Sequence, residues 1–170
     1  MRVLQICIVV SGMFLVVIGT LAQDGTSTAE SQTVTCTFSN GKEMTVRYVP
    51  APVKKDDRLR SGEALMPGGS AMVLFTGAEL KLGGTTVPVG AYTIYVIPGR
   101  KAWTLVVSKN EKPEAKYDPK QDLARADMET APLERFANPL AVYLGHVAPQ
   151  QCNIRVYYGN TAGWTEFLEK

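Results

Sequence analysis

The chain has 170 residues and a formal net charge of +2 at neutral pH, from 18 basic and 16 acidic side chains. A chain of this size folds as one domain around its own hydrophobic core and needs no metal ion to do so. The near balance of charge provides no basic surface, so we expect neither a nucleic acid partner nor attraction to an anionic membrane. We also find no motif for a cofactor.

Residues 1–22 have the pattern of an export signal. Arg2 precedes an almost unbroken apolar run, Val3–Ile18, and Thr20-Leu21-Ala22 then supplies the small residues of a cleavage site. This pattern is typical of a secretory signal peptide, so we expect a protein of the periplasm or the extracellular space. An uncleaved membrane anchor is the alternative, because about 20 apolar residues suffice to cross a bilayer.

Residues 23–32 contain no large apolar side chain and are predicted to form a flexible tether. The remainder, 33–170, is predicted to be a single domain rich in strands. Asn40-Gly41 predicts a hairpin with a type I′ turn between the first two strands, 33–39 and 42–49. Further alternating segments are found at 71–76, 79–82, 92–97, 102–108, 140–146, 152–158 and 164–168. This spacing predicts an all-β fold, an antiparallel, jelly-roll-like β-sandwich of about eight or nine strands.

Two segments interrupt the predicted strands. Asp118-Pro119 with Gln121 has the features of a helix N-terminus and predicts one short helix that ends by about Met128. Pro50–Pro67 combines prolines with mixed charges and predicts a long loop. A loop of this length in a compact domain is either functional or disordered.

Two cysteines remain once Cys7 leaves with the signal. Cys36 and Cys152 each fall on the apolar face of a predicted strand, near the two ends of the domain. An even number of cysteines in an exported chain favours a disulfide between them. Two separate buried thiols are the alternative.

The sequence offers no motif for catalysis or metal binding. His146 is the only histidine, and Gly68-Gly69-Ser70 lacks the second glycine of a nucleophile elbow. Asp118, Asp122 and Asp127 do not have the spacing of a calcium loop. We therefore assign no catalytic, cofactor-binding or metal-binding residue, although acid–base catalysis by paired carboxylates stays open.

Strand alternation places three polar or aromatic side chains on outward faces. Tyr95 alternates with core-facing residues of one strand, and Arg155 and Tyr157 with those of another. Exposed tyrosines stack on sugar rings or peptides, so these three residues are candidates for contact with a ligand. Cross-strand pairing, or burial of the strand on both sides, is the alternative.

Several motifs resemble the DUF2911 family of exported bacterial proteins. The matching segments are Val87–Thr93, Ile97-Pro98-Gly99, Trp103–Lys109, Cys36-Thr37-Phe38, Tyr117-Asp118, Asp122–Arg125 and Cys152–Arg155. The resemblance covers about residues 33–170 and implies a compact β-sandwich without an established activity. Pro67–Met72 lacks the Trp, Arg, Asn and Glu that many members carry there, so no functional residue is transferred.

We therefore expect an exported envelope protein that binds a small ligand, a glycan or another envelope protein without catalysis. The alternative is a carboxylate-based hydrolase or a glycan-modifying enzyme that uses His146 as well.

Overall fold

A computed structural model describes residues 30–57 and 59–170 of the protein. The predicted signal segment, 1–22, and most of the predicted tether lie outside the described residues. The described chain forms nine strands and two short 3₁₀ turns. These elements are β1 (Gln32–Thr37), β2 (Glu43–Tyr48), η1 (Pro67–Gly69), β3 (Met72–Thr76), β4 (Leu80–Leu82), β5 (Thr85–Val87), β6 (Gly90–Pro98), β7 (Trp103–Ser108), η2 (Pro119–Gln121), β8 (Asp122–Ala148) and β9 (Gln151–Glu169).

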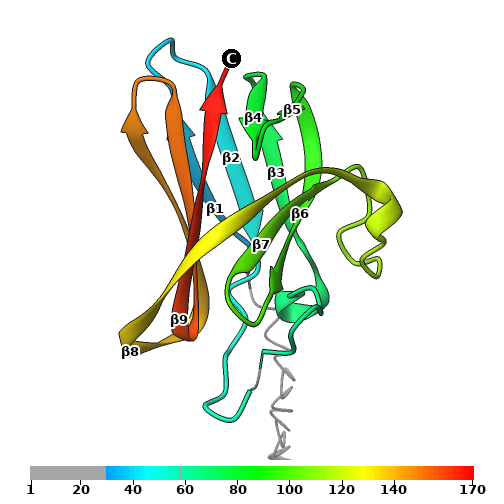
Figure 1. Ribbon diagram of the computed structural model, residues 1–170, viewed down its shortest axis with the longest axis vertical. Helices are drawn as coiled ribbons and strands as arrows, with labels where there is room; N and C mark the ends of the chain where they lie inside the picture. The colour runs from blue at the N-terminus through cyan, green and yellow to red at the C-terminus, as the bar shows by residue number, and fades with distance from the viewer. Residues whose placement is uncertain (1–29, 58) are drawn as a thin grey trace, which may run out of the picture.

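The strands pair antiparallel in the order β1-β2-β3-β6-β7-β8-β9-β4-β5 (Figure 1). This arrangement confirms the predicted all-β antiparallel fold. No helix in the described part of the chain is long and apolar enough to cross a membrane.

β9 reverses its direction near its middle. Its 19 residues would span about 60 Å if fully extended. Nevertheless, the Glu169 N–H donates a 2.7 Å hydrogen bond to the carbonyl of Gln150, which directly precedes the strand. Gly159 has a φ of +59°, as required at the first central residue of a two-residue type II′ turn with Asn160. Figure 1 shows the two arms of β9 side by side, the first in orange and the second in red.

The two ends of this hairpin give the same register. If Gln150 lies opposite Glu169, regular antiparallel pairing brings 158 opposite 161, the pair that a turn at 159–160 closes. The same register sets Cys152 beside Phe167, and both side chains are fully buried. It also sets Arg155 beside Trp164 on the opposite face of the strands.

β8 carries the chain from one layer to the other. Its first part, 122–128, pairs with β7, whereas 129–132 and 137–148 pair with β9. Register shifts after Pro132 and Ala137 mark the place where the strand turns, and Figure 1 shows it descending in yellow and rising in orange. The sheet therefore folds over on itself, which is compatible with the predicted sandwich.

The predicted helix is wrong beyond Gln121. The Asp118 side chain accepts a 3.0 Å hydrogen bond from the Lys120 N–H and caps η2, but β8 begins immediately afterwards. Ala124 and Met128 are buried, while the intervening Arg125 and Asp127 are exposed. Alternation with period two suits a strand, and the capping motif holds only a single turn.

The predicted type I′ turn of the first hairpin is also wrong, although the hairpin itself is confirmed. A type I′ turn needs a positive φ at both central residues, and no non-glycine residue in the described ranges has one. Asn40 instead uses its side chain, which accepts from the Lys42 N–H at 3.0 Å and donates to Glu169 at 2.6 Å. These two contacts hold the turn in a different conformation.

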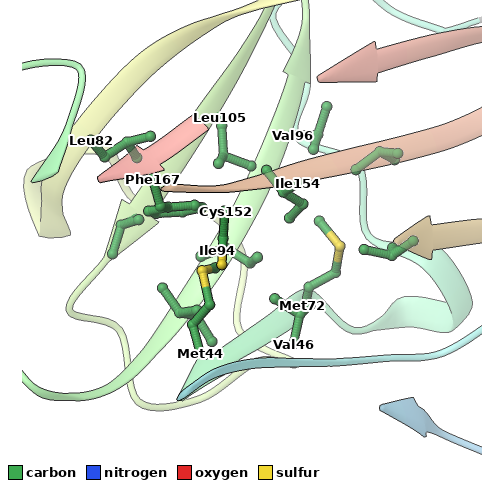
Figure 2. Packing of buried hydrophobic residues seen from close by; sticks show 14 of the residues in the cluster. Met44, Val46, Met72, Leu82, Ile94, Val96, Leu105, Cys152, Ile154 and Phe167 are labelled. Carbon is green, nitrogen blue, oxygen red and sulfur yellow. The ribbon is translucent and has the colours of Figure 1, made fainter. Parts of the chain in front are cut away.

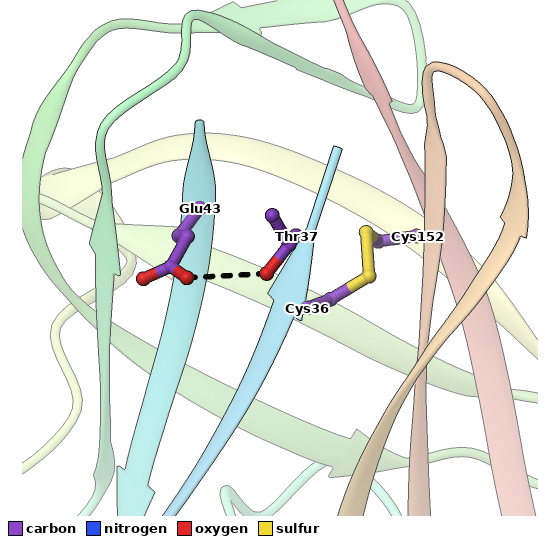
Figure 3. The surroundings of a disulfide bond; sticks show 4 residues. All are labelled: Cys36, Thr37, Glu43 and Cys152. Atoms are coloured by element: carbon purple, nitrogen blue, oxygen red, sulfur yellow. Dashed lines mark hydrogen bonds between the residues drawn. A yellow bond between two sulfur atoms is a disulfide. The ribbon is translucent and has the colours of Figure 1, made fainter. Parts of the chain in front are cut away.

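The core lies between the two layers of the folded sheet. Met44, Val46 and Leu105 from one layer face Ile154 and Phe167 from the other, and all five are fully buried (Figure 2). The predicted disulfide is present and joins β1 to the first arm of β9 (Figure 3). Its S–S length is 1.98 Å, and the Cα atoms of Cys36 and Cys152 lie 6.3 Å apart.

Removing this disulfide will lower the stability of the protein without exposing a new polar group. The bond closes a loop of 116 positions, for which chain entropy allows up to about 4–5 kcal/mol. We expect the double variant Cys36→Ala/Cys152→Ala to show a lower free energy of unfolding in denaturant titrations. The Thr37→Ala variant, beside the bond but exposed, is the control. Two free thiols in the native wild-type protein by mass spectrometry would contradict the prediction.

Candidate functional site

A groove opens where the second arm of β9 changes partners along one edge. Trp164 lies opposite Glu129 of β8, whereas Leu168 lies opposite Lys81 of β4. Between these pairs β8 diverges to join β7, so the strands separate and leave a groove of about 860 Å³. We call it the fork groove. Its walls consist of Lys81, Gly83, Gly84, Thr104, Arg125, Ala126, Asp127, Glu129, Trp164, Thr165, Glu166 and Leu168.

The walls of the fork groove follow from strand alternation. Ala124 and Met128 face the core, so Arg125, Asp127 and Glu129 face outward. Trp164 stands half-buried at the apex, where the two strands part. The groove thus combines one indole ring with side chains of both charges.

Arg125 is fixed in the wall of the fork groove by two neighbours. Its Nε donates to Asp122 Oδ2 over 2.5 Å, and its Nη2 donates to the hydroxyl of Tyr117. The Tyr117 hydroxyl in turn donates to Asp122 Oδ2 over 2.9 Å. Burial, followed by the hydrogen bond to Asp122, raises the pKa of the Tyr117 phenol, so it remains a donor. The hydrogen bond to Asp122 also raises the pKa of the Arg125 guanidinium.

The turn between β4 and β5 closes the far end of the fork groove. A Cβ atom at position 83 would lie 2.1 Å from the carbonyl oxygen of Arg125, and φ there is +55°. Only glycine permits this close approach of two backbones. Gly83 therefore sets the distance between the turn and β8.

A row of side chains crosses the outer face beside the fork groove. In the β8–β9 ladder Tyr143 lies opposite Arg155, and Trp164 lies opposite Glu129. The register of the β9 hairpin, set by the hydrogen bond between Glu169 and Gln150, brings Arg155 beside Trp164. We call these four residues the outer row. Opposed side chains on one sheet face have Cβ atoms about 5 Å apart, so neighbours in the row are in reach of each other. Tyr143 also packs edge-on against Tyr157, with ring centroids 5.4 Å apart.

The family of the chain follows from its sequence over most of its length. The family model described as "Protein of unknown function (DUF2911)" matches residues 29–164. The chain belongs to the DUF2911 family. Neither the curated proteins nor the solved structures include a match to it.

Two of the three predicted ligand-facing residues lie together in this DUF2911 protein. Arg155 is exposed and Tyr157 is half-buried, and both line a shallow hollow with Tyr143, His146 and Asn153. The predicted role of this face in ligand binding stays a prediction.

The expected exposure of Tyr95 is wrong. Tyr95 does point away from the main core, as alternation predicts, but it is fully buried in a second small cluster. The segment 64–71 covers it, Tyr117 packs at a ring distance of 4.9 Å, and the Asn110 amide donates to its hydroxyl over 3.1 Å. The loop that follows β2 thus forms a second layer over this part of the sheet.

The remaining candidates do not come together. Asp118 caps η2, Asp122 binds Arg125, and Asp127 lines the fork groove. Within residues 30–57 and 59–170, no three His, Cys, Asp or Glu side chains are placed to hold a metal ion. His146 is exposed, and Cys152, which lies opposite it in the β8–β9 ladder, is bonded in the disulfide.

Sequence analysis missed Trp164 and Tyr143 as site residues. Trp164 shares its strand parity with the charged Glu166, whereas Phe167 has the other parity, and this was the signal that Trp164 faces outward. The fork itself could not be read from the sequence because it depends on which strands pair.

Substitution at Gly83 will cost more stability than the same substitution at Gly84. Both residues have a positive φ, but a Cβ at position 84 has nothing within 4 Å. We expect Gly84→Ala to lose about 1–2 kcal/mol from backbone strain and Gly83→Ala to lose about 2 kcal/mol more from the clash with β8. Denaturant midpoints measure both. Equal losses would contradict the close approach at Gly83.

The Tyr117→Phe variant will lose about 1 kcal/mol of stability at neutral pH, because the Asp122–Arg125 pair loses its third partner. Since the folded state raises the pKa of Tyr117, its contribution is present at neutral pH and is lost as pH rises above about 10. The difference in unfolding free energy between wild type and Tyr117→Phe should therefore shrink at high pH. A difference that grows with pH would contradict this account.

Proposed function

We propose that this protein works outside the cytoplasm as a non-catalytic binding protein, with its ligand in the fork groove and along the outer row. The observation that carries the proposal is the position of Trp164. A half-buried indole at the apex of a groove with charged walls offers a large apolar surface beside hydrogen-bonding groups. Ligand sites combine these two features.

The polar groups of the fork groove are available to a ligand. Lys81, Asp127 and Glu129 form no ion pair and no side-chain hydrogen bond with any other residue that the structure describes. Arg125, by contrast, is already held by Asp122, so it shapes the wall and keeps its position when the ligand leaves. A wall that is rigid in the free protein reduces the entropy cost of binding.

Export supports the same proposal. The signal-like segment 1–22 directs the chain out of the cytoplasm, with cleavage after Ala22. The Cys36–Cys152 disulfide is compatible with an oxidising compartment, where such bonds persist. We therefore propose that the protein acts in the periplasm or outside the cell, where glycans, small ligands and other envelope proteins are potential partners.

A carboxylate-based hydrolase or glycan-modifying enzyme is the second candidate. The observation that favours it is the presence of Asp127, Glu129 and Glu166 in one groove, since such enzymes use two carboxyl groups on either side of the bond they cleave. The two candidates differ in the Glu129→Gln variant. An enzyme would retain its ligand and lose turnover, whereas a binding protein has no turnover to lose.

Binding is tested by a thermal-shift screen of the full chain, expressed for export, against glycans, peptidoglycan fragments, short peptides and divalent metal salts. A ligand at a hundred times its Kd should raise the Tm by roughly 5 °C. The Trp164→Ala variant should lose this shift. Phe75→Ala, which removes an exposed aromatic ring (38 % exposed) from the other layer, should retain it. A shift that survives in Trp164→Ala, or no shift with any class, would overturn the proposal.

A further inference from the structure

We infer that the ligand of the fork groove is a neutral sugar unit of a glycan, with one face of its ring stacked on Trp164. This inference rests on the proposed function and names the ligand class for the same site. Four properties of the groove support it: its charges, the hydrogen-bonding capacity of its walls, its size and the spacing of the nearby aromatic rings.

The charges of the fork groove select no ligand charge of either sign. Asp127 and Glu129 attract a cationic chain about as strongly as Lys81 and the neighbouring Arg155 repel it, and the reverse holds for an anionic chain. One oxygen of the Glu166 carboxylate accepts a hydrogen bond from the Gln151 amide, so Asp127 and Glu129 are the groove carboxylates without a partner among the described residues. A neutral ligand avoids repulsion by both sets of charges.

The unengaged groups favour a ligand with hydroxyls. Asp127 and Glu129 accept hydrogen bonds only, and Lys81 donates only. A sugar hydroxyl donates and accepts at once, so one sugar ring satisfies both kinds of group. A hydrogen bond to a charged partner is stronger than one between neutral groups, so these contacts favour a polyhydroxylated ligand.

Trp164 supplies the apolar contact that a sugar ring needs. The C–H groups of one face of the ring pack against an aromatic ring, while its hydroxyls point to the sides, where the charged walls lie. The groove volume of about 860 Å³ is within the range of small-molecule sites.

The outer row gives room for more than one sugar unit. Tyr143, which is 57 % exposed, lies two strand positions from Trp164 on the same face, or about 10 Å away. Arg155 lies between them and offers donors to hydroxyls. A glycan chain that enters the fork groove can thus continue over Tyr143 and its partner Tyr157.

Tryptophan fluorescence tests the inference directly, because the chain has only two tryptophans and Trp103 is buried, with 4 % exposure. Acrylamide quenching of the full chain therefore reports mainly on Trp164. The probes are neutral oligosaccharides (cello-, malto- and xylo-oligosaccharides and fully N-acetylated chitin oligomers), an anionic polymer (polygalacturonate) and a cationic peptide (hexalysine). We expect a neutral oligosaccharide to protect Trp164 from acrylamide and the two charged probes to have no effect.

Variants then separate stacking from general binding. We expect Tyr143→Ala and Glu129→Gln each to weaken binding of the active oligosaccharide by more than about tenfold in calorimetric titrations, and Trp164→Phe to retain part of the affinity that Trp164→Ala loses. Phe75→Ala should bind as wild type does. Unchanged thermal midpoints in these variants exclude misfolding as the cause of lost affinity.

Three results would overturn the inference. Protection by hexalysine or polygalacturonate but not by neutral oligosaccharides would reject the neutral sugar and leave the fork groove as a binding site. Protection of Trp164 only by a peptide or a metal from the thermal-shift screen would also reject the neutral sugar and leave the fork groove as a binding site. If no probe from either experiment protects Trp164, both the ligand class and the proposed function fail.

Discussion

The reversal of β9 at Gly159 is the constraint on which the other features of this protein depend. Because the strand doubles back, its first arm can meet β1 across the core through the Cys36–Cys152 disulfide, while its second arm can reach β4. The same register buries Cys152 and Phe167 on one face and leaves Arg155 and Trp164 on the other. One two-residue turn thus determines both the closure of the core and the composition of the outer face.

The fork groove is a consequence of how two layers share their strands. β8 and the second arm of β9 pair only from Glu129 to Pro132. Beyond Glu129, β8 pairs with β7, whereas the second arm of β9 continues to pair with β4. The far end of β9 is held in place by Glu169, whose buried carboxylate accepts from Asn40 at 2.6 Å and lies 3.5 Å from the Lys42 ammonium. The walls of the groove are therefore fixed by contacts outside it, which suits a site whose own polar groups stay available.

Sequence patterns predicted the local features of this protein, but they failed where contacts between distant segments determine the structure. Alternation alone located the inward cysteines and the outward Arg155 and Tyr157, because neighbouring side chains of a strand must face opposite sides. Alternation also predicted correctly that Tyr95 points away from the main core, but it could not show that the segment 64–71 covers this side chain. The capping motif at Asp118 predicted a turn correctly and its continuation wrongly, because pairing with β7 outweighs helix propensity. The arms of β9 correspond to the strands expected at 152–158 and 164–168, and Gly159-Asn160 suits the turn between them. The pairing of these arms with β8 and β4 depends on segments far along the chain.

Nuclear Overhauser contacts between backbone protons across the two arms of β9 test the central claim most directly. The account predicts contacts between Arg155 and Trp164 and between Cys152 and Phe167, since each pair lies directly opposite in one antiparallel ladder. These contacts would establish one continuous outer face from Tyr143 to the fork groove. Contacts of Trp164 with Asn153 or Tyr157 in place of Arg155, or no contacts between the arms, would contradict the register and with it the outer row.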